Sequence, residues 1–512
     1  MAKTASSSLF QLIQSLTQTE KRYLKLFLQK NVGGESDNYA RLFDGIDSQT
    51  DYDESKLKSF PHLAVMKVRL EETILWSLRD FHSGKSINSK LKADIRSVEI
   101  LFEKGLLDLA RRQLLKAKKT AVEYEEYLPL FELLKWEIKI ANAQGYISLS
   151  EQGLKDLYRE ADECLEKVLN ANQYAFFSDS VYIRIRKAGF FRNESDFKKF
   201  AKMIKHPMLR SDEKAASSDA KYYFHSTHIG FSELQADYHS AYAHNKKILA
   251  HLEAQPAIIR KQPRQYLSML QNTLVWQYQL KEYRQAIESA EKLKQFTIQQ
   301  KNSLSENLYN RTYYFNNTFL LLVHSRLGEY EKGTKLVKQF TQEFTDQRIR
   351  PTGKEAEWMF YDACAITFFG VGNFSEASKY QNKIIQDNEE GLRSDMQSMS
   401  RIFALIVHFE LGNQELLRYM VKWTYRFLIK RNRLYKFETI ILEFIRKKIQ
   451  HLNTRKERVD AFIDLKKELE KLLPDRFQRR PLDDFEFTDW LESKIQNKPF
   501  AEIVQKKYAK RL

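Results

Sequence analysis

Bulky and small residues stand three positions apart at several points along the chain. In Tyr283-Arg284-Gln285-Ala286 a bulky residue, two spacers and a small residue open a stretch that Ala290 and Leu293 continue on the same helical face. The signature recurs at Leu107/Ala110, Tyr158/Ala161, Tyr238/Ala241, Tyr330/Gly333 and Phe374/Ala377, with weaker copies at Phe197/Phe200 and Gln414/Leu417. Successive bulky residues lie between 39 (158 to 197) and 51 (107 to 158) positions apart. A repeat of this length predicts a tandem array of helical units.

Each unit is expected to be a pair of helices. Before Tyr283, apolar residues at helical spacing between 267 and 278 predict a first helix, and residues 280–282 predict a short turn. In later copies the turn contains Gly328, Gly372 or Gly412, which suits the left-handed cap that ends many helices. Because each pair leaves one apolar face bare, neighbouring pairs must stack.

These helix pairs resemble tetratricopeptide repeats over roughly residues 95–430. The resemblance implies an all-α fold: a right-handed α-solenoid of antiparallel helix pairs, with an N-terminal helical cap and basic C-terminal helices. The units are longer than the family's usual length of about 34 residues, and the family's closing proline is mostly missing.

Breaks in the pattern divide the chain into four regions. Residues 1–83 predict a helical capping domain, 90–205 a first repeat block, 219–412 a second repeat block and 413–512 a basic helical region. In the cap, residues 17–20 predict a capping site, and residues 19–27 resemble the opening of bacterial helical-repeat proteins without known activity. Residues 39–81 leave a second interpretation open, a DNA-binding helix-turn-helix.

Composition agrees with long helices. The 512 residues include only 16 Gly and 9 Pro, and 43% are hydrophobic, which excludes a disordered chain. Two widely separated cysteines suit a reducing compartment. The N-terminal residues lack the apolar core of a secretion signal, and no apolar run approaches the roughly 20 residues of a membrane span. We therefore expect a cytoplasmic protein with no membrane partner.

Positive charge concentrates near the C-terminus. The net charge is +17, and residues 418–458 hold 13 Lys/Arg against 3 Asp/Glu, which is 13 − 3 = +10. The densest bases are Arg426, Lys430, Arg431, Arg433 and Lys436, and they alternate with the aromatic residues Tyr425, Phe427, Tyr435 and Phe437. Such a segment can bind a nucleic acid or an acidic protein. Alternatively, the aromatic residues face the core and the bases form a solvated outer face.

No catalytic, cofactor or metal motif stands out. Gly84-Lys85-Ser86 lacks the earlier glycine of a phosphate-binding loop. His225 and His228 could share a metal on one helix, with His239 and His244 nearby, yet carboxylate or cysteine ligands are missing at suitable spacing. Neither cysteine has a histidine at motif spacing. We therefore expect a non-enzymatic protein without cofactors.

Three functional hypotheses follow. The first is a protein-interaction scaffold that binds a peptide or partner protein on the concave face of the array. Its candidate contact residues lie in polar and aromatic clusters of the first helices: Tyr222, Tyr313, Asn316, Asn317 and Trp358. The second is a nucleic-acid-associated regulator that uses residues 418–458 or the N-terminal helices, with the repeats as sensor. The third, an enzyme on a helical frame, requires buried ionisable residues that meet in a pocket.

Overall fold

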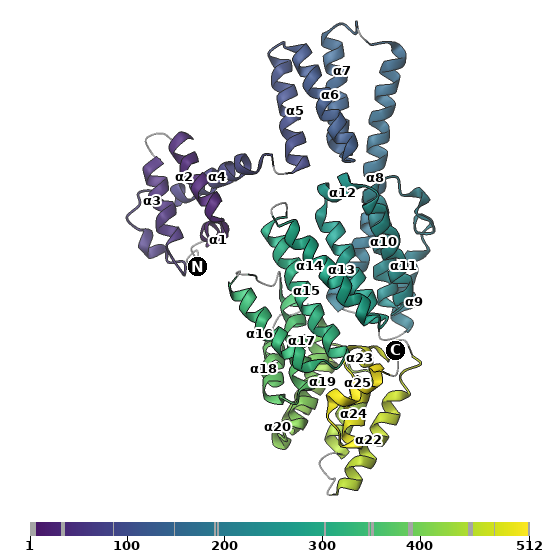
Figure 1. Cartoon of the computed structure of the whole chain (residues 1–512). Helices are drawn as coiled ribbons and strands as arrows, with labels where there is room; N and C mark the ends of the chain where they lie inside the picture. Colours follow the sequence, from purple (N-terminus) through teal and green to yellow (C-terminus); the bar gives the residue numbers. More distant parts are fainter. Residues whose placement is uncertain are drawn as a thin grey trace. The chain divides into compact units, whose positions relative to one another are not determined.

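The computed structural model of the chain is built from helices (Figure 1). It describes residues 7–31, 36–84, 86–147, 149–188, 191, 194–301, 304–346, 349, 353–387, 393–448, 454–475 and 477–509. No strand occurs in these ranges, and the predicted all-α class is confirmed. None of the described helices combines the length and the apolar character needed to cross a bilayer.

Internal contacts divide the chain into two units, Met1–Glu166 and Lys167–Leu512, which we describe separately as unit 1 and unit 2. Helix α8 (Glu151–Ala188) contributes to both. The finer division into four regions stays a prediction. The other helical segments of unit 1 are α1 (Ser8–Ser15), α2 (Gln18–Asn31), α3 (Ser36–Asp47), η2 (Glu54–Leu57), α4 (Leu63–His82), α5 (Ile87–Glu103), α6 (Leu107–Glu123) and α7 (Tyr127–Ala143).

Unit 1 contains two apolar cores. In the first, helices α1 to α4 surround the fully buried side chains of Leu42 and Phe43. Thr17 and Glu20 form the predicted capping site: the Thr17 backbone N–H donates to Glu20 Oε2 at 2.8 Å, and the Glu20 N–H donates to Thr17 Oγ1 at 3.3 Å. In the second core, α5, α6, α7 and the start of α8 pack around residues such as Leu133.

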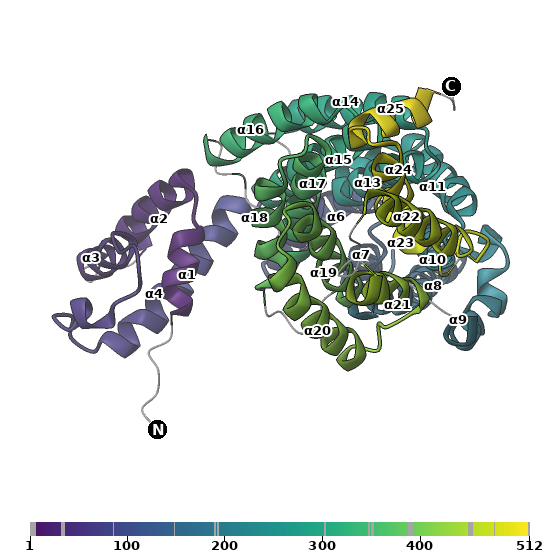
Figure 2. The same ribbon diagram turned by 90° about the horizontal axis from the view of Figure 1, so that it is seen from below.

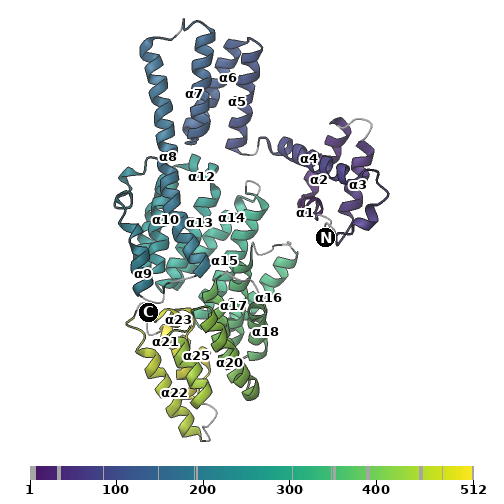
Figure 3. The same cartoon turned by 180° about the vertical axis from the view of Figure 1, so that it is seen from behind.

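Unit 2 continues with a longer series of helices, whose order can be followed in Figure 3. Its segments are α9 (Glu194–Ala201), η3 (Met203–Lys205), η4 (Pro207–Leu209), η5 (Asp212–Lys214), α10 (Ser218–Leu234), α11 (Tyr238–Glu253), α12 (Pro256–Lys261), α13 (Pro263–Gln279), α14 (Tyr283–Gln299), α15 (Glu306–Arg326), α16 (Tyr330–Asp346), α17 (Lys354–Gly370), α18 (Phe374–Ile385), α19 (Ser394–Glu410), α20 (Gln414–Lys430), α21 (Lys436–Glu443), the π-helical η6 (Phe444–Lys448), α22 (Arg455–Glu470), α23 (Arg480–Asp484), α24 (Phe487–Gln496) and α25 (Phe500–Ala509). Neighbouring helices pack on one another in sequence order.

A three-residue turn recurs between the two helices of a pair. Its middle residue is left-handed at Gly328, Gly372 and Gly412, with φ of +73°, +77° and +73°, as the glycine positions predicted. Lys281 takes the same place between α13 and α14 with φ of +66°. The bulky signature residue is the first residue of α6, α11, α14, α16 and α18. The copy at Tyr158, in contrast, lies inside α8.

In α16 the small residue of the signature, Gly333, lies where this helix meets α17, the first helix of the following pair. A Cβ placed on Gly333 of α16 would lie 2.7 Å from Thr367 Cγ2 of α17. On the same face, the Tyr330 ring covers Gly370 so closely that a Cβ there would overlap it. The bulky and the small residue therefore set the spacing between successive pairs.

The C-terminal helices turn back onto earlier helices of unit 2. Figure 2 shows α25, in yellow, beside α14, and the Tyr508 ring of α25 packs near the Tyr283 ring of α14. Phe485, Phe487 and Trp490 enter the same apolar core as residues of α17 and α19. The last part of the sequence thus packs against helices that precede it by 80 residues and more.

Candidate functional site

Helix α20 has a buried face and a broad exposed face. Leu417, Val421, Thr424 and Leu428 are buried and recur at steps of four, three and four residues. This spacing places them on one side of an α-helix, against α19 and η6. Met420 and Phe427 also pack partly against this core, and the other positions of α20 point away from it.

Basic side chains form a row along the exposed face. Arg418, Lys422, Arg426 and Lys430 recur every four residues, and all four are exposed. Residues four apart are neighbours on a helix, and like charges at this spacing destabilise it by roughly 0.2–0.5 kcal/mol per pair. Arg418, Lys422 and Arg426 form no salt bridge within the described residues. Within this part of the chain, ion pairs therefore do not offset the repulsion between these three bases.

Aromatic side chains lie beside these bases. Tyr419 is 61% exposed and Trp423 is 67% exposed, one residue after Arg418 and Lys422 respectively, and Tyr425 is 47% exposed. Among the other second helices of unit 2, α11, α14, α16 and α18, only Ile298 of α14 is a comparably exposed large apolar residue. Large apolar residues that gather on one exposed face indicate an interaction surface.

More positive charge lies at the C-terminal end of α20. The Arg401 guanidinium lies 3.8 Å from the centre of the Phe427 ring, and that of Arg431 lies 5.7 Å from it. Burial, and then the charge of Arg431, lower the pKa of Arg401 to about 10. We call the exposed face made by Arg418, Tyr419, Lys422, Trp423, Arg426 and Lys430 the α20 surface.

The five predicted polyanion-binding bases occupy different environments. Arg426, Lys430 and Lys436 are exposed, and Arg431 is half-buried. Arg433 is buried, and its Nε donates to Ser394 Oγ at 3.2 Å. The interpretation that all aromatic residues face the core holds for Phe437, which is fully buried, but is wrong for Tyr425.

Sequence reasoning did not single out Arg418, Lys422, Tyr419 and Trp423. The four-residue spacing of the bases was a signal that could have identified the row, because it places them along one side of a helix.

Four of the five predicted peptide-contact residues are buried in the interior of unit 2. Tyr313 is buried and donates its hydroxyl hydrogen to Glu343 Oε2 at 2.7 Å. Trp358 is buried, and its indole Nε1 donates to Asp387 Oδ2 at 3.2 Å. Asn316 and Asn317 are buried on α15, and Tyr222 is half-buried on α10. The first helices are covered on several sides, so their aromatic clusters pack inward.

Three of the four histidines considered as metal ligands meet in one cluster. His225 Nδ1 and His244 Nδ1 are 3.0 Å apart, and the rings of His228 and His244 stack with centroids 4.5 Å apart. His228 Nε2 donates to the Leu209 carbonyl oxygen at 3.0 Å. Burial is the largest cause that lowers the pKa of His225 to about 4 and that of His244 to about 3.

The histidine cluster is a packing element of unit 2. His239 lies exposed on α11, apart from the buried faces of the helix. Within the described ranges, no three His, Cys, Asp or Glu residues are placed to hold a metal ion.

The other chemical candidates occupy ordinary environments. Cys164 and Cys364 are both buried thiols, and burial raises the pKa of Cys364. Gly84 follows the end of α4 in a turn, whereas Lys85 lies outside the described residues. Neither cysteine therefore has the exposed, electropositive environment that activates a thiol.

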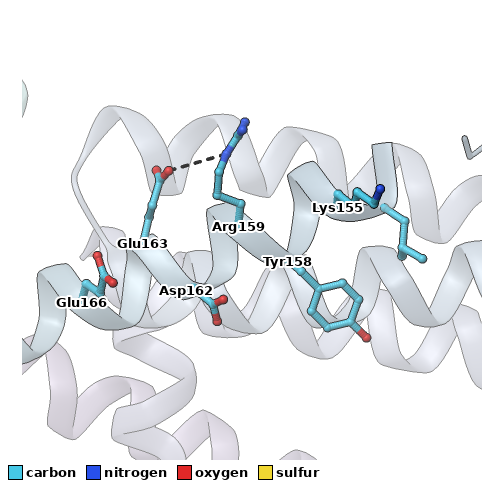
Figure 4. Close-up of a pocket in the computed structure, with 7 residues that line it drawn as sticks. Lys155, Tyr158, Arg159, Asp162, Glu163 and Glu166 are labelled. Carbon is cyan, nitrogen blue, oxygen red and sulfur yellow. Dashed lines mark ion pairs between the residues drawn. The ribbon is translucent and has the colours of Figure 1, made fainter. Parts of the chain in front are cut away.

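An open hollow lies along the exposed side of α8 in unit 1 (Figure 4). All of its lining residues, from Leu154 to Glu166, belong to this one helix. Arg159 forms ion pairs with Asp156 at 3.0 Å and with Glu163 at 3.8 Å along the helix surface. A single helix face with internally paired charges offers no enclosed site, so the α20 surface is the stronger candidate.

Comparison with models of known protein families and with curated proteins gives no match for this chain.

Proposed function

We propose that this protein is a non-enzymatic scaffold that binds single-stranded nucleic acid on the α20 surface. The observation that carries the proposal is the row of exposed bases with two exposed aromatic side chains beside it, Tyr419 and Trp423. Proteins that bind single strands combine positive charge along the backbone with aromatic rings on which bases stack.

The arrangement of charge favours nucleic acid over a membrane surface. A helix that lies on a bilayer separates its charged face from its apolar face. On α20 bases and rings share one side of the helix, because Tyr419 and Arg426, like Trp423 and Lys430, are seven residues or about two turns apart. Four residues of helix rise by about 6 Å, so successive bases can follow an extended phosphate backbone.

Exposed rings also favour nucleic acid over an acidic protein segment. An acidic protein segment needs only the bases, because its carboxylates pair with positive charge. Nucleobases can in addition stack on the exposed ring faces of Tyr419 and Trp423. A base stacked on an aromatic side chain contributes about 1–3 kcal/mol to binding. The choice between these partners can therefore be tested by changing charge and rings separately.

The repeat helices would present this surface. We propose that unit 2 is a right-handed solenoid of antiparallel, tetratricopeptide-like helix pairs, in which α20 is the second helix of the last pair. Sequential packing and the recurring left-handed turn support this architecture. The two free cysteines suit the reducing cytoplasm.

The test measures binding of a fluorescently labelled oligodeoxythymidine to the full chain by anisotropy at several salt concentrations. The first variant replaces Arg418, Lys422 and Arg426 with Gln. A matched control replaces Lys332, Lys335 and Lys338, exposed lysines of α16, with Gln. Because each contacted phosphate contributes about −0.7 to the salt slope, the α20 variant should lose about two units of slope. The α16 variant should bind almost as the unchanged chain does.

A second variant separates stacking from charge. Trp423→Ala keeps every base, and it should weaken oligonucleotide binding about fivefold or more. Equal binding of polyglutamate and the oligonucleotide, with no effect of Trp423→Ala, would assign the surface to an acidic protein instead. Equal losses in the α16 and α20 charge variants would show that net charge alone attracts the strand.

A further inference from the structure

The C-terminal residues 477–509 run along the turns of the helix pairs in unit 2, and we call them the C-terminal strap. At its start, the Phe477 ring lies 5.9 Å from the Phe197 ring of α9. Three residues later, Arg480 Nη1 donates to the hydroxyl of Tyr238, the first residue of α11. This contact joins positions 242 residues apart.

A buried arginine ties the strap to the next two pairs. Arg326, at the end of α15, donates from Nη1 to the Glu486 carboxylate and from Nη2 to the Asp483 carbonyl oxygen. Its Nε donates to the hydroxyl of Tyr278, in α13, at 2.6 Å. Burial alone would lower the pKa of this guanidinium, but interactions with Glu486, Tyr278 and Tyr283 outweigh it and hold the pKa well above its usual value. One guanidinium thus holds α13, α15 and the strap together.

The strap next reaches the last two pairs. The Phe485 ring lies 5.5 Å from the Phe369 ring of α17 and 4.6 Å from the Phe403 ring of α19. Trp490 Nε1 donates to Glu410 Oε1 at 2.6 Å at the end of α19. Both apolar and polar contacts therefore fasten the pair that contains α20.

Helix α25 then returns along the same turns. The Phe500 ring lies 5.7 Å from the Tyr330 ring of α16. Gln505 Nε2 donates to the Gly328 carbonyl oxygen at 2.8 Å, and the Tyr508 ring lies 5.8 Å from the Tyr283 ring of α14. A Cβ on Gly328 would lie 2.6 Å from Gln505 Cγ, so this glycine serves the strap as well as the turn.

These contacts change the energetics expected of a repeat array. In a simple array each repeat contacts only its neighbours, and an end can unfold without the other end. The strap touches α11 at one end of the series, α19 at the other end and the three pairs between them. If one pair unfolds, the strap loses the contacts that it makes with that pair. Because the same strap also contacts the other pairs, its loosening destabilises them as well.

We propose that the C-terminal strap is a clamp that makes the five helix pairs from α10 to α20 unfold as one cooperative unit. The clamp also fixes α19, and with it the α20 surface, to the rest of unit 2. The proposal does not depend on what the α20 surface binds.

The test follows amide hydrogen exchange of the full chain by mass spectrometry. Leu405→Ala creates a cavity in α19, where Leu405 is fully buried. In α19 the substitution should lower protection by about thirtyfold or more. If the strap couples the pairs, protection in α11 should fall by the same factor. Leu133→Ala, in the second core of unit 1, is the control and should leave α11 and α19 unchanged.

A second variant assigns the coupling to the strap. In the Phe485→Ala background, Leu405→Ala should lower protection in α19 but much less in α11. Unchanged protection of α11 after Leu405→Ala alone would overturn the proposal. This outcome can be observed even if the Phe485→Ala variant does not fold. Coupling that persists undiminished in the Phe485→Ala background would also overturn it, because stacking between neighbouring pairs would then carry the coupling.

Discussion

Acidification should destabilise unit 2 through the buried histidines His225, His228 and His244. These rings pack against one another, and His225 Nε2 lies 3.3 Å from Asp212 Oδ2. Burial lowers the pKa of all three, and the nearby charge of Lys247 acts in the same direction, whereas Asp212 raises the pKa of His225 and His244. The folded chain therefore favours neutral imidazoles.

The direction of the pH effect follows from proton binding. In the unfolded chain a histidine has a pKa of about 6.5, whereas in the folded chain those of His225 and His244 are about 4 and about 3. Between these values the unfolded state binds more protons, so stability falls as the pH decreases. At pH 5 the protonation of each of these two histidines in the unfolded chain should lower the free energy of unfolding by about 2 kcal/mol, because one pKa unit corresponds to about 1.36 kcal/mol.

Hydrogen exchange of α10 and α11 at pH 7 and pH 5, corrected for intrinsic exchange rates, measures this loss. His244→Asn removes one titrating ring and should reduce the pH-dependent loss of protection by about 2 kcal/mol. His239→Asn, at an exposed position of the same helix, is the matched control and should leave the loss unchanged. Equal loss of protection at pH 5 in the unchanged chain and in His244→Asn would contradict the assignment of the pH effect to this cluster.

Three further predictions concern the packing, two of them with a control substitution. Ala286→Trp places a large side chain at a fully buried position of α14 and should destabilise that helix pair by about 1–3 kcal/mol or more; an unchanged urea unfolding curve would contradict the placement. Gly370→Ala should lower the melting temperature because its Cβ would overlap the Tyr330 ring, whereas Gly84→Ala, with nothing within 4 Å, should not. Arg433→Gln should destabilise unit 2 because this arginine is buried, whereas Arg426→Gln should leave circular dichroism melting unchanged and weaken only oligonucleotide binding.

Local features of the fold could be predicted from the sequence. Gly328, Gly372 and Gly412 mark turns because a left-handed residue favours glycine wherever it occurs. Tyr283 and Tyr330 mark helix starts because the turn before them has a fixed length of three residues. The prediction of a helix start at Tyr158 was wrong, because the same spacing of a bulky and a small residue also fits the interior of a long helix such as α8.

Features that depend on distant contacts could not be predicted. Which side of α20 is buried depends on α19 and η6, so Trp423 could not be placed on the exposed side from aromatic content alone. Burial of Asn317 and Trp358 results from helices on several sides of α15 and α17. The pairing of Arg326 with Glu486 spans 160 residues, and no local pattern connects the two.

The most direct measurement of the central proposal is ultraviolet cross-linking of the full chain to a single-stranded oligonucleotide, followed by mapping of the cross-linked peptides by mass spectrometry. The α20 surface should yield adducts within residues 414–430, centred on Tyr419 and Trp423, and a duplex of the same sequence should yield few. Adducts confined to the cap helices α1 to α4, or to no defined segment, would contradict the account.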